Sequence, residues 1–215
     1  MSDVINNVRR ALGKKNTPES APIPPEIDER IVRLVQSDVG LPELLVAQAR
    51  KSAMGAELVY VDDLVEKLVA FFRANQCAKI AMPVSPLLDG LEIGVRLRDA
   101  GFDVKRWDEL SADAIYEYDC GLTDCYAAVA ETGSLVMRAT PQHGRCLSLV
   151  PPIHVAIVEP RLIVGDLLDL MEKLSSEKDH PGTAIITGPS KTSDIEGNLV
   201  TGVHGPKMVQ VYVLK

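Results

Sequence analysis

The chain has 215 residues, of which 46% are hydrophobic and 25% charged, and its formal net charge is -7. This length and composition predict a folded globular protein with one medium-sized domain. The acidic balance argues against nucleic acid as a partner, because binding to phosphates requires a basic face. No apolar run approaches the length that spans a bilayer, so we expect no membrane span. Four cysteines without a dense framework are typical of free thiols in a cytoplasmic protein.

The chain begins with an amphipathic pattern. Residues 3–14 have apolar side chains at helical spacing and basic residues between them, and residues 16–25 (NTPESAPIPP) contain four prolines. We therefore predict two parts, a helix with a proline-rich linker over residues 1–25 and an α/β domain over residues 26–215. The helix could equally well fold back on the domain or reach a partner, and both alternatives stay open.

Helices and strands then alternate, which predicts an α/β fold with a parallel-type sheet. Neither Gly-x-Gly-x-x-Gly nor Gly-x-x-x-x-Gly-Lys-Ser/Thr occurs, so dinucleotide and P-loop folds are disfavoured. The predicted helices are 26–37, 41–54, 62–76 and 87–100, and the predicted strands are 58–61, 79–82 and 102–107.

Shorter apolar runs follow residue 110, and they predict closely spaced strands that make the sheet a mixed one. A hairpin is expected around Glu131–Gly133, because the turn residues there separate two apolar runs. The predicted strands are 127–130, 134–137, 147–150, 154–158, 184–186 and 209–214, with a helix over 164–176.

The first candidate site is Glu131-Thr132-Gly133, at the end of an apolar strand. A carboxylate beside a glycine that allows other backbone to approach suits a nucleophile, an acid or a base. The same three residues could instead form an exposed turn without a function.

The second candidate site is the stretch from Gly188 to Pro206, which follows the apolar strand 184–186. Ser190 and Thr192 are expected as N-caps of a helix, whose amides would hold an anion. His204 is a candidate for orienting a ligand or exchanging a proton. The alternative is a connection with well-chosen turn residues. The expected ligand-binding residues here are Gly188, Ser190, Lys191, Thr192, Asp194 and Glu196.

The cysteine and histidine pattern does not predict a metal site. Cys120-x4-Cys125 and His143-x2-Cys146 could together supply four ligands to zinc. However, the first spacing is wider than in zinc knuckles, and no Cys-x-x-Cys or iron–sulfur run occurs. We therefore expect neither a metal ion nor another cofactor.

Four ordered motifs in the C-terminal half resemble the LUD domain family: GLTDCYAAVAETG (121–133), LVPPIH (149–154), GPSKTSDIE (188–196) and GVHGP (202–206). The resemblance implies a three-layer α/β/α fold similar to the NagB/RpiA and CoA-transferase group. It also implies a part in bacterial L-lactate oxidation to pyruvate, alongside iron–sulfur partner proteins. The chain lacks the ferredoxin-like cysteine runs of those partners, which fits a subunit that carries no cluster.

Three kinds of function therefore remain open. The leading hypothesis is an accessory protein or subunit of lactate utilization that binds a small anionic metabolite. The second is a stand-alone CoA-transferase-like or ligase-like enzyme that uses Glu131 as nucleophile, by analogy with CoA-transferase relatives. The third is an interaction module whose N-terminal arm docks on a partner.

Overall fold

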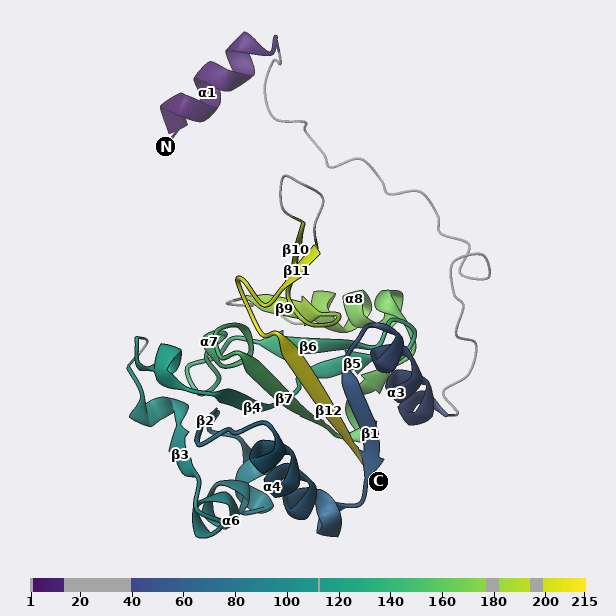
Figure 1. Cartoon of the computed structure of the whole chain (residues 1–215). Coiled ribbons are helices and arrows are strands. Elements are labelled where there is room, and N and C mark those ends of the chain that lie inside the picture. Colours follow the sequence, from purple (N-terminus) through teal and green to yellow (C-terminus); the bar gives the residue numbers. More distant parts are fainter. Residues whose placement is uncertain (1, 14–39, 112, 177–181, 194–198) are drawn as a thin grey trace. The chain divides into compact units, whose positions relative to one another are not determined.

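The computed structural model describes residues 2–13, 40–111, 113–176, 182–193 and 199–215 (Figure 1). Helix α1 (Ser2–Ala11) confirms the predicted N-terminal helix, and Val4 and Val8 on it are exposed, as is Leu12 just after it. The predicted linker 16–25 and helix 26–37 lie outside the described residues. The boundary between residues 25 and 26 stays a prediction.

A six-stranded sheet forms the centre of the α/β domain, and all its neighbouring strands are parallel. The order is β1-β12-β7-β4-β2-β3, so the last strand of the chain lies next to the first strand of the sheet. Strand β7 is buried along its whole length, as expected of parallel strands covered on both faces. The strands are β1 (Gly55–Val59), β2 (Lys79–Met82), β3 (Asp103–Arg106), β4 (Cys120–Asp124), β7 (Ile153–Val158) and β12 (Met208–Leu214).

Three helices cover one face of this sheet: α4 (Leu64–Ala74), α5 (Pro86–Gly90) and α6 (Ile93–Asp99). They connect β1 to β2 and β2 to β3, and Figure 1 shows α4 and α6 on the same side of the strands. Their inward side chains meet alternate residues of the strands in one core. Its largest helical members are Leu64, Leu68, Phe72, Leu88, Ile93 and Leu97.

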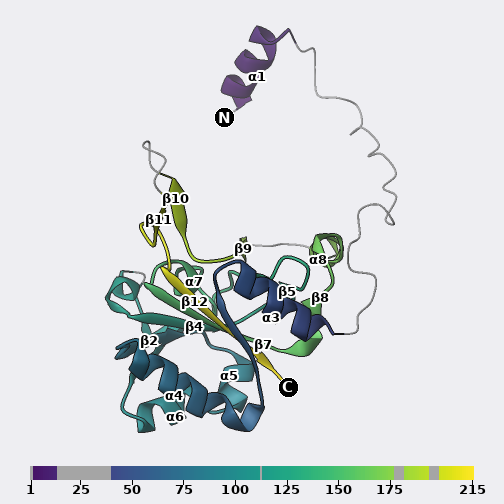
Figure 2. The ribbon, with the colours of Figure 1, turned by 45° about the vertical axis from the view of Figure 1, so that its right-hand side comes forward.

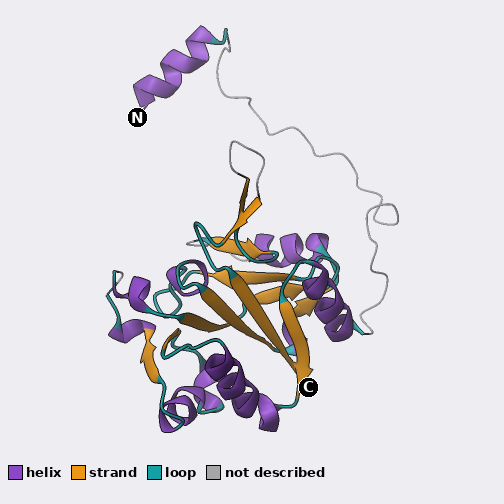
Figure 3. Ribbon diagram, in the orientation of Figure 1, coloured by secondary structure: helices purple, strands orange, loops and turns teal. Residues whose placement is uncertain are grey.

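Helix α3 (Leu41–Lys51) and a second sheet cover the opposite face. Figure 2 shows α3 beside β1, and Figure 3 shows the short strands of the second sheet above the central one. Helix α8 (Leu167–Ser175) packs on the outer side of this second sheet through Leu170. The second sheet has the order β8-β5-β6-β9, with β8 (Ile163–Val164), β5 (Ala127–Val129), β6 (Ser134–Arg138) and β9 (Thr183–Ile186).

The predicted α/β class is therefore confirmed, with a mostly parallel sheet and flanking helices. The expected mixture of parallel and antiparallel pairing is divided between two sheets. The central sheet is parallel, whereas β6 pairs with β5 and β9 antiparallel. The β5–β6 pairing also confirms the hairpin around Glu131–Gly133. The specific similarity to the NagB/RpiA group stays a prediction.

Two predicted elements were wrong: one predicted helix is broken into two helices, and one predicted strand is a helix. The single helix 87–100 is broken into α5 and α6, because Glu92 adopts a left-handed conformation with φ of 53°. The predicted strand 147–150 is instead a short helix, α7 (Cys146–Leu149). Four apolar residues are too few for their periodicity to distinguish a helix from a buried strand.

Two further differences from the prediction concern the first residue of α4 and the strand β4, which was not predicted. A 3-10 turn, η1 (Val61–Asp63), precedes α4, so the helix begins at Leu64 and Asp62 is not its N-cap. Strand β4 was not predicted, because Gly121 and Thr123 interrupt its apolar pattern. A side chain at position 121 would meet the backbone of Leu147, with a Cβ only 2.8 Å from its carbonyl carbon.

His154 is the polar residue at the centre of the buried strand β7. Its side chain is fully buried, and its Nε2 lies 2.9 Å from Oγ1 of Thr123 on the neighbouring strand β4. Burial, followed by the nearby His143, lowers the pKa of His154 to about 3. The histidine is therefore neutral in the folded protein at neutral pH.

We predict that His154 makes the fold sensitive to acid. The unfolded chain takes up a proton at this residue below about pH 6.5, whereas the folded chain does so only near pH 3, so stability falls as the pH drops between these values. Between pH 7 and pH 5 this one group should cost about 2 kcal/mol of unfolding free energy.

Urea denaturation of the natural protein and of the His154→Gln variant at both pH values measures this contribution, which should be missing from the variant. The exposed His204 provides the control variant His204→Gln, which should behave like the natural protein. An NMR titration of the natural protein checks the same point without a variant. An imidazole of His154 that is protonated at pH 5 would contradict the prediction.

Candidate functional site

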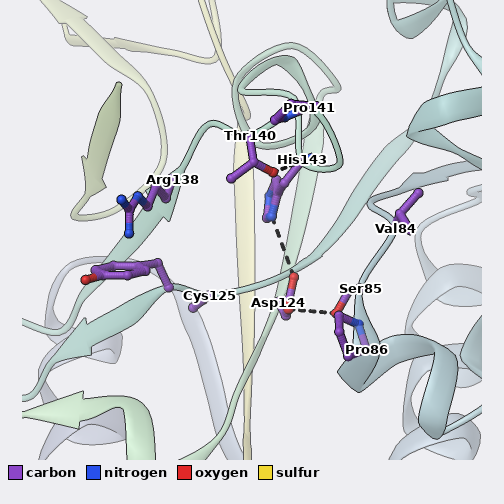
Figure 4. Close-up of a pocket in the computed structure, with 10 residues that line it drawn as sticks. Val84, Ser85, Pro86, Asp124, Cys125, Arg138, Thr140, Pro141 and His143 are labelled. Atoms are coloured by element: carbon purple, nitrogen blue, oxygen red, sulfur yellow. Dashed lines mark hydrogen bonds and ion pairs between the residues drawn. The ribbon is translucent and has the colours of Figure 1, made fainter. Parts of the chain in front are cut away.

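A cavity of about 490 Å³ lies at the carboxyl ends of β2 and β4. After β2 the chain runs outward to β3 and then returns to β4 on the other side of β2, so the direction of strand addition reverses between these two strands. In open α/β sheets such a reversal leaves a crevice in which ligands bind. The lining residues are Val84, Ser85, Pro86, Asp124, Cys125, Tyr126, Arg138, Thr140, Pro141 and His143 (Figure 4).

Asp124, the last residue of β4, connects the polar groups of this cavity. Its Oδ2 accepts a hydrogen bond of 2.7 Å from the hydroxyl of Ser85, and its Oδ1 lies 3.6 Å from Nδ1 of His143 (Figure 4). Ser85 is also the N-cap of α5, where its hydroxyl accepts from the backbone N–H of Leu88 at 3.4 Å. The carboxylate is thus held by a side chain whose own position is set by a helix terminus.

A tight turn after β6 presents His143 to Asp124. The backbones of Thr140 and His143 exchange two hydrogen bonds, and Oγ1 of Thr140 accepts a third from the N–H of His143 at 3.0 Å. Pro141 at the second position suits such a turn. The carbonyl of Gln142 accepts from the N–H of Val84 at 3.0 Å, which attaches the turn to the end of β2.

His143 is largely buried, with 15% of its side chain exposed. Burial lowers the pKa of His143, and the carboxylate of Asp124 acts in the opposite direction. Within the part of the chain that the structure describes, its Nε2 has no hydrogen-bond partner. The imidazole is therefore a neutral, oriented group in the wall of the cavity.

Arg138 brings a positive charge to the cavity from the end of β6. Its guanidinium carbon lies 5.0 Å from the ring centroid of Tyr126. The Nζ of Lys173 lies 4.7 Å from the same centroid. A guanidinium over an aromatic face is held by a cation–π interaction and keeps its planar donors in a defined orientation.

The order of contacts differs from a Ser–His–Asp triad. In a triad the histidine lies between the serine and the carboxylate and removes the proton of the hydroxyl. Here Asp124 lies between Ser85 and His143, and the hydroxyl donates to the carboxylate. The arrangement therefore lacks the histidine between serine and carboxylate on which activation of the serine in a triad depends.

The predicted site residues Glu131–Gly133 lie elsewhere, at the turn of the β5–β6 hairpin and thus at the opposite end of that hairpin from Tyr126 and Arg138. The N–H of Glu131 donates to the carbonyl of Gly165 at 3.0 Å. Gly133 has φ of 69°, and a Cβ there would lie 2.7 Å from Cα of Ala49 in α3, so glycine is required for packing.

The two sequence-predicted segments are adjacent in the fold. The hydroxyl of Ser134 lies 2.6 Å from that of Thr132 and 2.6 Å from that of Thr187, which precedes Gly188. A Cβ at Gly188 would lie 2.6 Å from the carbonyl oxygen of Ser52, so this segment also approaches the end of α3 closely. Whether these groups hold a ligand stays a prediction.

The expected helix after Gly188 was wrong. Lys191–Ser193 forms strand β10, which pairs antiparallel with β11 (Leu199–Thr201). The backbone of Ser190 continues this pairing, since its N–H donates to Pro206 and its carbonyl accepts from Gly202. Ser190 and Thr192 therefore cap no helix here, and the proposed anion site loses its helix amides. Asp194 and Glu196 lie outside the described residues.

His204 is exposed and lies in a different hollow from His143. It lines a second cavity of about 410 Å³ together with Tyr116, Leu149, Val150, Pro152, Gly202, Val203 and Gly205. Ser190 is close to this turn, because a Cβ at Gly205 would lie 3.1 Å from the Cβ of Ser190. His204 thus shares neither the 490 Å³ cavity nor the Glu131 turn.

Sequence reasoning missed Ser85 and Asp124 and considered His143 only as a metal ligand. The signal for Ser85 was a serine followed by proline after the strand 79–82, which is an N-cap pattern. No comparable local signal connects Asp124 to His143, since 19 residues separate them and only the fold brings them together. Among the described residues, no three histidine, cysteine or acidic side chains are grouped to share a metal ion. Of the helices in the described ranges, none has the length and apolar character to cross a membrane.

The chain is similar to several known proteins. The chain is 38% identical over 117 residues to a lactate utilization protein C from an Exiguobacterium species, covering 50% of this chain and 50% of that protein. A lactate utilization protein C from Deinococcus radiodurans is 37% identical over 118 residues, covering 53% of this chain and 55% of the relative. The chain thus spans about half the length of these two relatives.

Longer matches exist at lower identity. A lactate utilization protein C from Bacillus licheniformis is 28% identical over 184 residues, which cover 80% of this chain and 68% of that protein. The crystal structure of a DUF162 family protein from Deinococcus radiodurans superposes with a TM-score of 0.62 at 22% identity, covering 84% of this chain and 99% of that chain. This likeness shows the shared fold.

The family model of the LUD domain matches residues 44–214, which include both sheets and the 490 Å³ cavity. The matched range includes the four motifs, between residues 121 and 206, that resemble that family. The chain belongs to the LUD domain family.

Proposed function

We propose that this chain is an accessory protein or subunit of bacterial L-lactate utilization that binds a small anionic metabolite in the cavity between β2 and β4. It would act with iron–sulfur proteins in the oxidation of L-lactate to pyruvate. The printed name of the relatives, lactate utilization protein C, supports the process. The observation that supports the site is Arg138, a cation at a crevice where α/β sheets bind ligands.

The chemistry of the cavity suits a carboxylate. Arginine offers planar N–H donors that match the two oxygens of a carboxylate, and Thr140 adds a hydroxyl at the same wall. Losing one charge-assisted hydrogen bond of this kind costs roughly 1.5–3 kcal/mol, which is about a ten- to hundredfold loss of affinity.

We predict that Arg138→Gln impairs growth on L-lactate. The variant, expressed in a strain that lacks the natural gene, should grow slowly on L-lactate and normally on glucose. The matched control is Arg161→Gln, because Arg161 is 73% exposed and pairs with Glu159 outside the cavity. Normal growth of a folded, normally abundant Arg138→Gln protein on L-lactate would contradict the proposed site.

Two further variants test whether the turn at Glu131 and the segment at Ser190 also contact the ligand. If Glu131 and Ser190 contact the ligand as the sequence suggests, then Glu131→Gln and Ser190→Ala should also slow growth on L-lactate while thermal stability stays close to that of the natural protein. If both variants stay folded and grow normally, the two segments serve packing and the ligand-binding role there is wrong.

The accessory role has its own test. Purified protein alone should not turn over L-lactate, whereas an extract that lacks only this protein should regain lactate oxidation when it is added back. Turnover of L-lactate, or transfer of a CoA group that depends on Glu131, by the isolated protein would favour the stand-alone enzyme instead.

A further inference from the structure

The two outer strands of the central sheet, β1 and β3, each have one side that pairs with no strand of the described residues (Figure 1). β1 pairs with β12 on its other side, and β3 pairs with β2. The backbone N–H and C=O groups on an unpaired side are a template to which another chain can add a strand. The groups that occupy these two edges therefore decide whether the sheet can be extended.

The carbonyl of Ala56 points out from the edge of β1. Val59 shows which way the strand faces, because its carbonyl accepts a hydrogen bond of 2.9 Å from the N–H of Lys215, the residue after β12. Backbone groups alternate in direction along a strand, so those of Ala56, three residues earlier, point away from β12. Ala56 lies opposite Val211, within the paired part of β1, and its carbonyl is thus part of the exposed ladder edge.

Arg50 occupies this outward carbonyl. Its Nε donates a hydrogen bond of 2.7 Å to the carbonyl of Ala56. The arginine lies in the last turn of α3, and a tight turn in which Ala53 has φ of 62° brings the chain back as β1. Among the described residues, this is the hydrogen bond that reaches the outward groups of β1. Because a guanidinium stays charged, Arg50 also places a positive charge at this edge.

The backbone groups of Val104 and Arg106 point out from the edge of β3. The intervening and preceding residues face β2, as the N–H of Asp103 shows by donating to the carbonyl of Ala78 at 2.9 Å. Since the direction alternates along the strand, the groups of the next residue and of the one two positions beyond it face outward.

Two charged side chains occupy these outward groups of β3. Nη1 of Arg98, on α6, donates to the carbonyl of Val104 at 3.2 Å. Oε2 of Glu109, in the 3-10 turn η2 (Trp107–Glu109), accepts from the N–H of Arg106 at 2.9 Å. One acceptor and one donor of this edge are therefore already bonded to side chains of the same chain.

We propose that Arg50, Arg98 and Glu109 close the central sheet to strand addition, so that the chain meets other proteins, or a second copy of itself, without extending that sheet. An added strand has to break one of these hydrogen bonds and cover a charged group that has lost its partner, which is costly. Natural proteins use charged side chains at sheet edges to prevent edge-to-edge association. This inference goes beyond the proposed lactate function and does not depend on it.

The variant Arg50→Met tests the edge of β1, because it keeps a long side chain and removes both the donor and the charge. Sedimentation equilibrium of the full chain should show self-association at about ten- to hundredfold lower concentration than for the natural protein, since one charge-assisted hydrogen bond no longer has to be broken. The matched control is Lys51→Met, which removes the same charge from the neighbouring exposed residue of α3 and should behave like the natural protein.

Hydrogen exchange of backbone amides locates the new contact. The N–H groups of Ala56 and Leu58 face outward from β1, so their exchange in Arg50→Met should slow as the protein concentration rises. In the natural protein, the exchange of these amides should not depend on concentration. The double variant Arg98→Met, Glu109→Ala applies the same test to the N–H of Val104 on β3.

A folded Arg50→Met protein that associates no more than the natural protein would overturn the proposal, whatever its heat stability, because Arg50 would then only attach α3 to β1. Slowing of the Ala56 and Leu58 amides with concentration in the natural protein would overturn it as well. A measurement without a variant is the NMR exchange rate of the Nε–H of Arg50, which should be slow. Exchange as fast as in an unfolded chain would contradict the hydrogen bond on which the closure of β1 rests.

Discussion

Both faces of the central strands β7 and β12 are buried, and the need to cover them sets the arrangement of the other elements. Every residue of β7 is buried, and its side chains alternate between two cores. Parallel strands of this kind are stable only when each face is covered. Helices α4, α5 and α6 cover one face, and α3 with the second sheet covers the other. The connection between β4 and β7 supplies β5 and β6 of this second sheet, and the connection between β7 and β12 supplies β8 and β9. The first of these connections also contains the turn that carries His143.

The cavity follows from that connection. The chain leaves β2 on the side of α5 and α6, whereas it leaves β4 towards the second sheet, so the carboxyl ends of these two strands are not covered by a common element. Residues at this gap are held by backbone groups nearby: Ser85 caps α5, and Thr140 closes the turn that presents His143. The polar side chains are thereby oriented by contacts within the chain itself.

The motif around Glu131 shows how packing can produce a dense polar pattern. Gly133 is needed because α3 passes directly over it, and Thr132, Ser134 and Thr187 satisfy one another through a chain of hydroxyl groups. Polar residues that are buried near a sheet require such partners whether or not a ligand binds. A high density of polar residues after a strand therefore indicates a place where backbone and side chains approach closely. It does not by itself indicate a catalytic or binding site.

The α/β class, most of the strands and the hairpin at Glu131–Gly133 could be predicted from the residues alone, because apolar periodicity and turn residues act over a few neighbouring positions. The sequence also carried the motifs of the LUD domain family. It could not determine that residues 147–150 form a helix or that Lys191–Ser193 forms a strand, since short segments take their conformation from distant partners. The order of the strands became visible only in the folded chain, and this order places Ser85, Asp124, Arg138 and His143 around one cavity. These residues come from three separate segments, 84–86, 124–126 and 138–143. No local pattern encodes contacts that depend on how far a crossover connection carries the chain across the sheet.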